Sequence, residues 1–243
     1  MHINPYKVFE QLNTLTEAPF AQLVKIEDTY IICASPERFI QKKGNQLITQ
    51  PMKGTARRNN NPIEDEQIKQ TLKSNIKEQT ENVMAVDVAR NDLSRIATKG
   101  SVIVNDLFGV QTFKNVHQMV STVSCELKEN ISFDDIIEAT FPPASMTGAP
   151  KLKAIELIKK YEAIERGIYS GILGQIDGNG DFDFCVVIRT IIYNEKTKQL
   201  SFHVGSAITS QCNPEEEWNE CLLKADTIFT SLGLTQNDVI FSS

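Results

Sequence analysis

Two glutamates and a lysine share one face of an apolar helix near the end of the sequence. Glu217, Glu220 and Lys224 stand at i, i+3 and i+7 in the segment Pro214–Leu232, whose apolar residues recur at helical spacing. Two carboxylates one turn apart are hard oxygen ligands that Mg²⁺ accepts beside water and substrate oxygens, and Lys224 could then reach an anion. A solvated helix face with a Glu220–Lys224 ion pair fits the same pattern, and the helix by itself does not decide.

A lysine before a Gly-Thr pair could act as a nucleophile. Lys53 lies in PMKGTARR, directly before that pair. A lysine amine becomes nucleophilic when burial or a neighbouring cation lowers its pKa, and Arg57 and Arg58 are close in the sequence. Most lysines are solvated surface residues, so the fold must separate the two hypotheses. Glu37, in the segment SPERF, is a possible neighbour in space.

Two further segments could hold an anion. Thr147 is predicted to be the N-cap of a helix over Gly148–Arg166, with Pro150 in its first turn. The first N–H groups of such a helix suit an anion, although an ordinary capped helix has the same sequence pattern. Arg189 is predicted to lie on a largely apolar face of the strand Phe182–Ile192, where its guanidinium needs a carboxylate from the protein or from a ligand.

Residues 81–95, ENVMAVDVARNDLSR, combine an apolar stretch with a dense charged cluster. The apolar stretch predicts a strand over Val83–Val88, and the cluster after it is typical of a structural ion-pair network. Glu81 precedes the strand and is less easily explained as structural. It becomes a candidate metal ligand if Glu220 lies opposite it.

The elements that must position these residues are predicted to form one α+β domain over residues 1–243. Helical patterns cover Tyr6–Thr14, Ile68–Gln79, Phe133–Thr140, Gly148–Arg166 and Pro214–Leu232. Strand patterns cover Ala21–Lys25, Tyr30–Ala34, Val83–Val88, Gln118–Leu127, Gly171–Ile176, Phe182–Ile192 and Leu200–Gly205. The strict alternation of a doubly wound parallel sheet is missing, so we expect mostly antiparallel sheets.

Composition narrows the class of protein. The 243 residues, 41% of them hydrophobic, can bury a substantial core. A net charge of −6 and a pI near 5.2 argue against a nucleic-acid surface, and no apolar run predicts a membrane span or a signal peptide. The five scattered cysteines fit a reducing compartment. We therefore expect a soluble cytoplasmic protein that binds neither nucleic acid nor membrane.

Six segments occur in the order and at about the spacing of the chorismate-utilising enzymes. They are SPERF (35–39), PMKGTARR (51–58), ENVMAVDVARNDLSR (81–95), FPPASMTGAPK (141–151), YSGILG…FDFCVVIRT (169–190) and GSAITSQCNPEEEWNECLLKA (205–225). The chain resembles this family from about Pro5 to Leu232. The family includes anthranilate synthase component I, isochorismate synthase, salicylate synthase and aminodeoxychorismate synthase component I. The resemblance implies a single α+β domain with two large antiparallel sheets packed face to face and helices outside.

The resemblance also implies a site for Mg²⁺ and chorismate. Glu81 and Glu220 would hold the metal, with Glu217 assisting through water, and the metal would bind the ring carboxylate. The carboxylates of chorismate would be held by Arg189, Lys224 and the backbone N–H groups around Gly205, Ser206 and Ala207. Thr147 and Gly148 would line the same pocket. A metal, an arginine, a lysine and a helix N-terminus would concentrate positive charge for a dianion without making the whole surface basic.

Within the family, the residue before Gly-Thr divides the subgroups. Anthranilate synthases resemble P-I-A-G-T, whereas this chain has PMKGT and resembles the aminodeoxychorismate synthases. The resemblance implies that Lys53 adds at C2 of chorismate while the C4 hydroxyl leaves, and that ammonia then adds at C4 and expels the lysine. Glu37 would protonate the hydroxyl, and His117 would face the ring near it. A glutamine amidotransferase subunit would supply ammonia for this step of para-aminobenzoate and folate synthesis.

The sequence departs from the family pattern at several places. GSAIT replaces the commoner G-A-G-I, Ser94 stands where glycine is usual, and Gln175 stands where tyrosine is frequent. The first strands of the family are missing before Asn4, so we expect an N-terminally truncated domain. Two alternatives stay open: an anthranilate synthase component I, and an inactive chorismate-fold module that serves as a binding partner.

Overall fold

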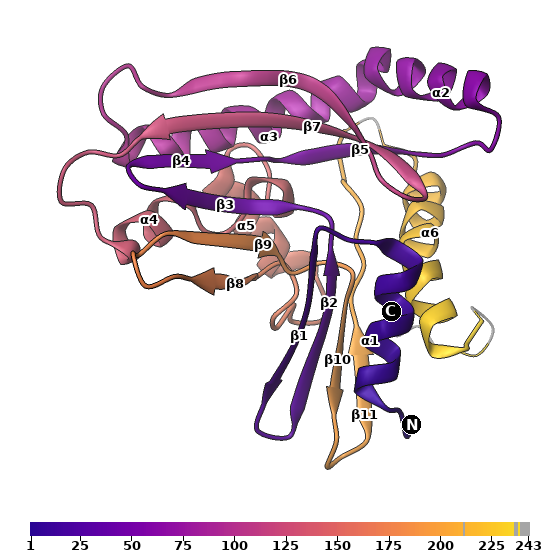
Figure 1. Cartoon of the computed structure of the whole chain (residues 1–243). Helices are drawn as coiled ribbons and strands as arrows, with labels where there is room; N and C mark the ends of the chain where they lie inside the picture. Colours follow the sequence, from indigo (N-terminus) through magenta and orange to yellow (C-terminus); the bar gives the residue numbers. More distant parts are fainter. Residues whose placement is uncertain (211, 236–237, 239–243) are drawn as a thin grey trace. The chain divides into compact units, whose positions relative to one another are not determined.

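The computed structural model describes residues 1–210, 212–235 and 238, and Figure 1 shows its elements. Contacts group the chain into two compact units. The first contains Met1–Pro36, Arg166–Tyr169 and Val187–Ser243, and the second contains Glu37–Glu165 and Ser170–Val186. The prediction of a single domain over residues 1–243 stays a prediction.

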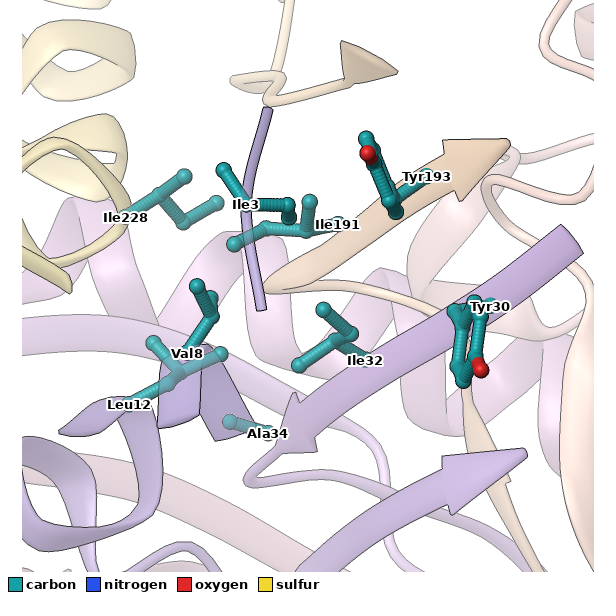
Figure 2. Packing of buried hydrophobic residues seen from close by; sticks show 9 residues of the cluster. All are labelled: Ile3, Val8, Leu12, Tyr30, Ile32, Ala34, Ile191, Tyr193 and Ile228. Carbon is teal, nitrogen blue, oxygen red and sulfur yellow. The ribbon is translucent and has the colours of Figure 1, made fainter. Parts of the chain in front are cut away.

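The first unit contains a four-stranded antiparallel sheet and two helices. Its strands, in sheet order, are β1 (Phe20–Ile26), β2 (Thr29–Ser35), β10 (Thr190–Asn194) and β11 (Gln199–Phe202), and its helices are α1 (Pro5–Thr16) and α6 (Pro214–Leu232). The alternation of Tyr30, Ile32 and Ala34 places these side chains on one face of β2. Figure 2 shows them packed with Ile3, Val8, Leu12, Ile191, Tyr193 and Ile228 in one buried cluster.

Helix α6 has a capping residue at each end. The side chain of Asn213 accepts hydrogen bonds from the N–H groups of Glu215 and Glu216, and Pro214 occupies the first turn, where a missing N–H is harmless. Gly233 ends the helix in the left-handed conformation, with φ of 66°. The predicted bounds of this helix are therefore confirmed at both ends.

The second unit contains a seven-stranded antiparallel sheet with helices. The sheet order is β5 (Met52–Arg57), β7 (Val116–Glu126), β4 (Gln46–Thr49), β3 (Arg38–Lys43), β9 (Phe182–Val186) and β8 (Ile172–Ile176), and β6 (Ile103–Thr112) also pairs with β7. The helices are α2 (Pro62–Ser74), α3 (Ile76–Ile96), α4 (Phe133–Thr140), the short 3₁₀ helix η1 (Ala144–Met146) and α5 (Lys151–Tyr161). In Figure 1, α3 runs along the strands β5, β7 and β4.

Two helices are packed on one face of this sheet through specific side chains. The amide oxygen of Asn82, fully buried on α3, accepts a hydrogen bond from the hydroxyl of Ser121 on β7. The ring of Phe133 on α4 meets Phe182 edge-on at 5.4 Å and lies 5.9 Å from Phe184. Alternate residues of a strand share a face, so these contacts define the covered side of β7 and β9.

The α+β class with antiparallel sheets is confirmed, and three predicted elements are corrected. The predicted strand Val83–Val88 lies inside α3. The predicted helix Ile68–Gln79 joins the end of α2 to the start of α3, because Asn75 ends one helix and caps the next. The predicted strand Phe182–Ile192 divides into β9 and β10 at Arg189, whose φ is 51°. Within the described residues, no helix is both long enough and apolar enough to cross a membrane.

Candidate active site

Lys53 lies on β5, directly after a residue whose backbone contacts a buried carboxylate. The side chain of Glu37 is buried, and its Oε1 accepts a hydrogen bond from the N–H of Met52 at 3.4 Å. Lys53 itself is half-buried, and within the described part of the chain its amine makes no hydrogen bond or ion pair. Glu37 thus reaches the backbone next to Lys53, and a contact between the two side chains stays a prediction.

Helix α3 approaches β5 at the residue after Lys53. Gly54 has φ of 84°, and a Cβ at this position would lie 2.9 Å from Glu78 Oε2 and 3.1 Å from Glu78 Cβ. A side chain here would be strained and would collide with the helix. Glu81 lies one turn after Glu78 on the same side of α3, so it is carried toward the strand that holds Lys53.

His117 occupies a buried network on the covered face of β7. Its Nε2 lies 2.9 Å from Asp65 Oδ1, and its Nδ1 lies 3.0 Å from Thr112 Oγ1. The Arg58 guanidinium beside Asp65 lowers the pKa of that carboxyl to about 2. Both ring nitrogens are engaged within the protein, which supports a structural role for His117. Its place beside the substrate ring stays a prediction.

Gln118, the next residue on β7, points to the opposite face. Its Nε2 donates a hydrogen bond of 2.9 Å to Thr55 Oγ1, two residues after Lys53. Its Oε1 is buried and has no hydrogen-bond partner among the residues that the structure describes. A buried carbonyl oxygen without a donor is unusual, which makes Gln118 a functional candidate that the sequence analysis missed. Strand alternation between residues 117 and 118 was the available signal.

Thr147 is not the N-cap of a helix. It ends η1, and its hydroxyl lies 3.3 Å from the carbonyl oxygens of Pro143 and Ala144. Helix α5 begins at Lys151 and has no side-chain cap, so Gly148 lies in the loop before it. The prediction of a helix N-terminus at Thr147 and Gly148 is therefore wrong, because the hydroxyl turns back toward η1. A role in lining the pocket stays a prediction for both residues.

The buried ammonium of Lys151 holds this loop to α3. Its Nζ lies 2.6 Å from Asp92 Oδ2 and donates to the carbonyl oxygens of Thr140 at 2.8 Å and Pro142 at 2.7 Å. Burial raises the pKa of the Asp92 carboxyl, and the neighbouring ammonium opposes this shift. One cation thereby connects α3, the end of α4 and the loop that carries Thr147.

In the first unit, the predicted metal carboxylates meet at one hydroxyl. The hydroxyl of Ser206 is hydrogen-bonded to the carboxylate of Glu217 and lies 3.0 Å from Glu220 Oε2. Lys224 Nζ lies 2.5 Å from Glu220 Oε1 and donates to the carbonyl oxygen of Gly205 at 2.9 Å. The i, i+4 ion pair is present, but Glu217 is only 4% exposed. This face of α6 is therefore not a simple solvated surface.

Arg189 and the segment around Gly205 lie near the same part of α6. Arg189 lies in the break between β9 and β10, not within a strand, and its carbonyl accepts from the N–H of Ala34 at 3.2 Å. Burial raises the pKa of the Cys221 thiol, while the charges of Lys224 and Arg189 act in the opposite direction. The guanidinium is thus close enough to act on α6, although the predicted strand position was wrong.

The extended segment before α6 has no room for a side chain at its glycine. A Cβ on Gly205 would lie 2.7 Å from the hydroxyl of Tyr169. The Tyr169 ring in turn packs against His203, with centroids 5.4 Å apart. Ala207 is half-buried in the same segment, and Gln211, which follows in the motif, lies outside the described residues. Close packing at Gly205 fixes the backbone that was predicted to hold a carboxylate.

The oxygens gathered on α6 suit a small divalent cation. Glu217, Glu220 and Ser206 offer hard oxygen donors, and Mg²⁺ typically takes one or two carboxylates and completes its shell with water and substrate oxygens. In the described ranges, no three His, Cys, Asp or Glu side chains form a ready-made metal cage. Glu81 belongs to the second unit, so its joining this pair stays a prediction.

Comparisons with known proteins point to one family of enzymes. A family model described as chorismate binding enzyme matches residues 1–230. Aminodeoxychorismate synthase component 1 of Salmonella typhimurium is 38% identical over 227 residues, which cover 93% of this chain and 50% of that protein. Anthranilate synthase component 1 of Aquifex aeolicus is 32% identical over 233 residues, which cover 96% of this chain and 47% of that protein.

A solved structure shows the same fold. Anthranilate synthase component I from Streptococcus pneumoniae matches with a TM-score of 0.83 and 29% identity, covering 93% of this chain and 49% of that one. The chain spans about half the length of the curated relatives that it matches.

Proposed function

The chain belongs to the family of chorismate-binding enzymes, and on that premise we propose that it aminates chorismate at C4, as the synthase component of aminodeoxychorismate formation. The observation that supports the proposal is the half-buried Lys53 on β5, directly after Met52, whose backbone N–H donates to the buried carboxylate of Glu37. A lysine at this position offers a nucleophile that an alanine would not. A relative from Bacillus subtilis carries the same name as the Salmonella protein.

The proposed chemistry uses Lys53 as the nucleophile and Glu37 as the acid. The amine of Lys53 forms a bond to C2 of chorismate, the two ring double bonds move from C1=C2 and C5=C6 to C1=C6 and C4=C5, and the C4–O bond breaks. Glu37 gives the departing hydroxyl its proton, and water leaves. Ammonia then bonds to C4, the two double bonds move back, the lysine amine leaves C2, and a proton of the added ammonia returns to Glu37. The net reaction is chorismate plus ammonia to 4-amino-4-deoxychorismate plus water, divided into two easier displacements.

Charged side chains would hold the metal and the substrate. Glu81, Glu217 and Glu220 would hold Mg²⁺, which when bound neutralises the ring carboxylate. Arg189 and Lys224 supply the remaining positive charge, and a planar guanidinium matches a carboxylate. Because Lys224 already touches Gly205, the anion and the backbone N–H groups of that segment would be held together.

We also propose that a separate glutamine amidotransferase supplies ammonia in the cytoplasm, and that the product serves para-aminobenzoate and folate synthesis. The name component 1 among the relatives supports a partner component. A relative with this name and one named anthranilate synthase are both similar to the chain, so an anthranilate synthase activity is the second candidate.

The product of the reaction distinguishes the candidates. The chain is incubated with chorismate, ammonium and Mg²⁺, and the product is identified by mass spectrometry. We expect 4-amino-4-deoxychorismate from the wild type and none from Lys53→Ala. Anthranilate with pyruvate would contradict the assignment and support the second candidate. Unchanged chorismate, with an amidotransferase still bound, would support an inactive partner module.

The metal assignment has a separate control. Glu220→Gln keeps the size of the side chain but replaces one carboxylate oxygen by an amide nitrogen and removes the charge, so Mg²⁺-dependent turnover should be lost. Glu215→Gln, on the first turn of the same helix, is a matched control that should keep turnover. Normal Mg²⁺ dependence in Glu220→Gln would remove Glu220 from the metal site.

A further inference from the structure

We propose that the side chain of Ser206 is a positioning residue for the metal carboxylates, holding Glu217 and Glu220 side by side so that they accept one divalent cation. The inference rests on the proposed function and adds a role that the family resemblance does not give. The resemblance assigns to this segment only backbone N–H groups that hold a substrate carboxylate. The hydroxyl of Ser206 points instead to the carboxylates of α6.

The Ser206 hydroxyl has one proton and two carboxylates that can accept it. The Ser206 hydroxyl contacts Oε2 of Glu217 and, at 3.0 Å, Oε2 of Glu220. A hydroxyl has a single proton, so it donates to one carboxylate at a time and meets the other as oxygen against oxygen. Two carboxylates that converge on one oxygen repel each other. A cation bound between the two carboxylates and the hydroxyl would offset this repulsion. The three oxygens are the donor type that Mg²⁺ and Mn²⁺ prefer.

The other oxygen of Glu220 is fixed by a second contact. Lys224 Nζ binds Glu220 Oε1 at 2.5 Å and the carbonyl oxygen of Gly205 at 2.9 Å. The residue before Ser206 is therefore held to α6 by its carbonyl, while Ser206 itself is held by its side chain. This pair of contacts sets which oxygen of Glu220 is turned toward Glu217.

Because Glu217 is buried, its carboxylate depends on the hydrogen bond from the Ser206 hydroxyl. Glu217 is 4% exposed, so water has little access to satisfy its carboxylate, and a hydrogen bond from the protein must replace it. Groups that orient metal ligands typically change metal affinity by about 10–100-fold when they are removed. For Ser206→Ala we expect Mn²⁺ to bind at least about tenfold more weakly. Ser206→Thr keeps the hydroxyl and should stay within about threefold of the wild type.

The test is a titration of the full chain with Mn²⁺, in which electron paramagnetic resonance measures free Mn²⁺ with and without chorismate. The titration compares the wild type with Ser206→Ala, Ser206→Gly, Ser206→Thr and Glu220→Gln. Circular dichroism melting of each variant confirms the fold, and Ser206→Gly serves as a second variant without the hydroxyl. Weaker binding in the alanine and glycine variants, with recovery in the threonine variant, supports the inference.

Two results would overturn it, and they are distinguishable. If Ser206→Ala binds Mn²⁺ within twofold of the wild type while Glu220→Gln loses binding, the metal site stands and Ser206 has no part in it. If the wild type and Glu220→Gln bind Mn²⁺ equally, the metal site itself fails and the role of Ser206 fails with it.

Discussion

Replacing Lys151 by methionine removes the ammonium that binds three buried acceptors. The side chains of Lys151 and Asp92 are only 14% and 9% exposed, and their charged atoms are 2.6 Å apart. Methionine fills a similar volume but has no proton to donate. The Asp92 carboxylate would then be buried without a partner, and the carbonyl oxygens of Thr140 and Pro142 would lose their donor.

The size of the loss follows from the burial of that carboxylate. Breaking a buried ion pair by removing one partner costs about 3–5 kcal/mol. The two carbonyl hydrogen bonds belong to the same ammonium, so their energies are not added separately. We expect Lys151→Met to lose about 3–5 kcal/mol of free energy of unfolding at neutral pH. Asp92→Leu in the Lys151→Met background should recover about half or more, since the unpaired charge is then gone.

The pH dependence of the variant gives a second readout with a definite sign. Burial already raises the pKa of Asp92 above 3.8, and without the ammonium the pKa rises further. When folding raises the pKa of a carboxyl, the stability that the carboxyl contributes is greatest below its pKa in the unfolded chain. That stability is lost as the pH rises through its pKa in the folded protein. The deficit of Lys151→Met should therefore be smaller at pH 5 than at pH 8.

Urea unfolding of the full chain, followed by far-ultraviolet circular dichroism at both pH values, measures this deficit. A stability within about 1 kcal/mol of the wild type at neutral pH would refute the reasoning, because it would show that Asp92 finds water or another donor. A deficit of equal size at both pH values would refute the part that concerns the unpaired charge.

Three further predictions concern the surroundings of Lys53. Gly54→Ala should cost about 1–3 kcal/mol and lower turnover, whereas Gly100→Ala, with nearly the same φ of 81° but open space around it, should cost less in a urea titration. The Arg58 guanidinium lowers the pKa of Asp65 to about 2, so the stability that Asp65 contributes is present above pH 3.8 and lost toward pH 2. The difference in melting temperature between the wild type and Asp65→Asn should therefore shrink from pH 3.8 to pH 2. A constant difference would contradict this prediction. Gln118→Leu should change the free energy of unfolding by no more than about 1–2 kcal/mol while reducing turnover, and unchanged turnover would exclude Gln118 from the pocket.

The helices with sequence signals at both ends were predictable. Asn213 and Gly233 flank the apolar periodicity of α6, and Phe133–Thr140 was predicted residue for residue, with Ser132 and Asp135 forming a capping box. Helix α3 was misread in part as a strand because its middle, VMAVDVA, is rich in β-branched residues. Packing against the sheet, through Asn82 and Ser121, overrides that local preference.

The sequence predicted which residues belong to the candidate site better than it predicted how they contact one another. The spacing of Glu217, Glu220 and Lys224 gave the shared helix face directly, whereas the contact of Ser206 with the two carboxylates depends on a chain reversal that no periodicity records. The choice between His117 and Gln118 depends on strand register, and a shift by one residue exchanges the two faces. Sequence order alone could not show that Glu37 reaches the backbone beside Lys53.

The most direct test of the account is the intact mass of the chain after mixing with chorismate in the absence of ammonia. We predict an increase equal to chorismate less one water, located by peptide mapping on the segment that contains Lys53, and its disappearance when ammonium is added. Lys53→Ala should show no increase. An unmodified chain, together with an active Lys53→Ala variant, would contradict the covalent role of Lys53.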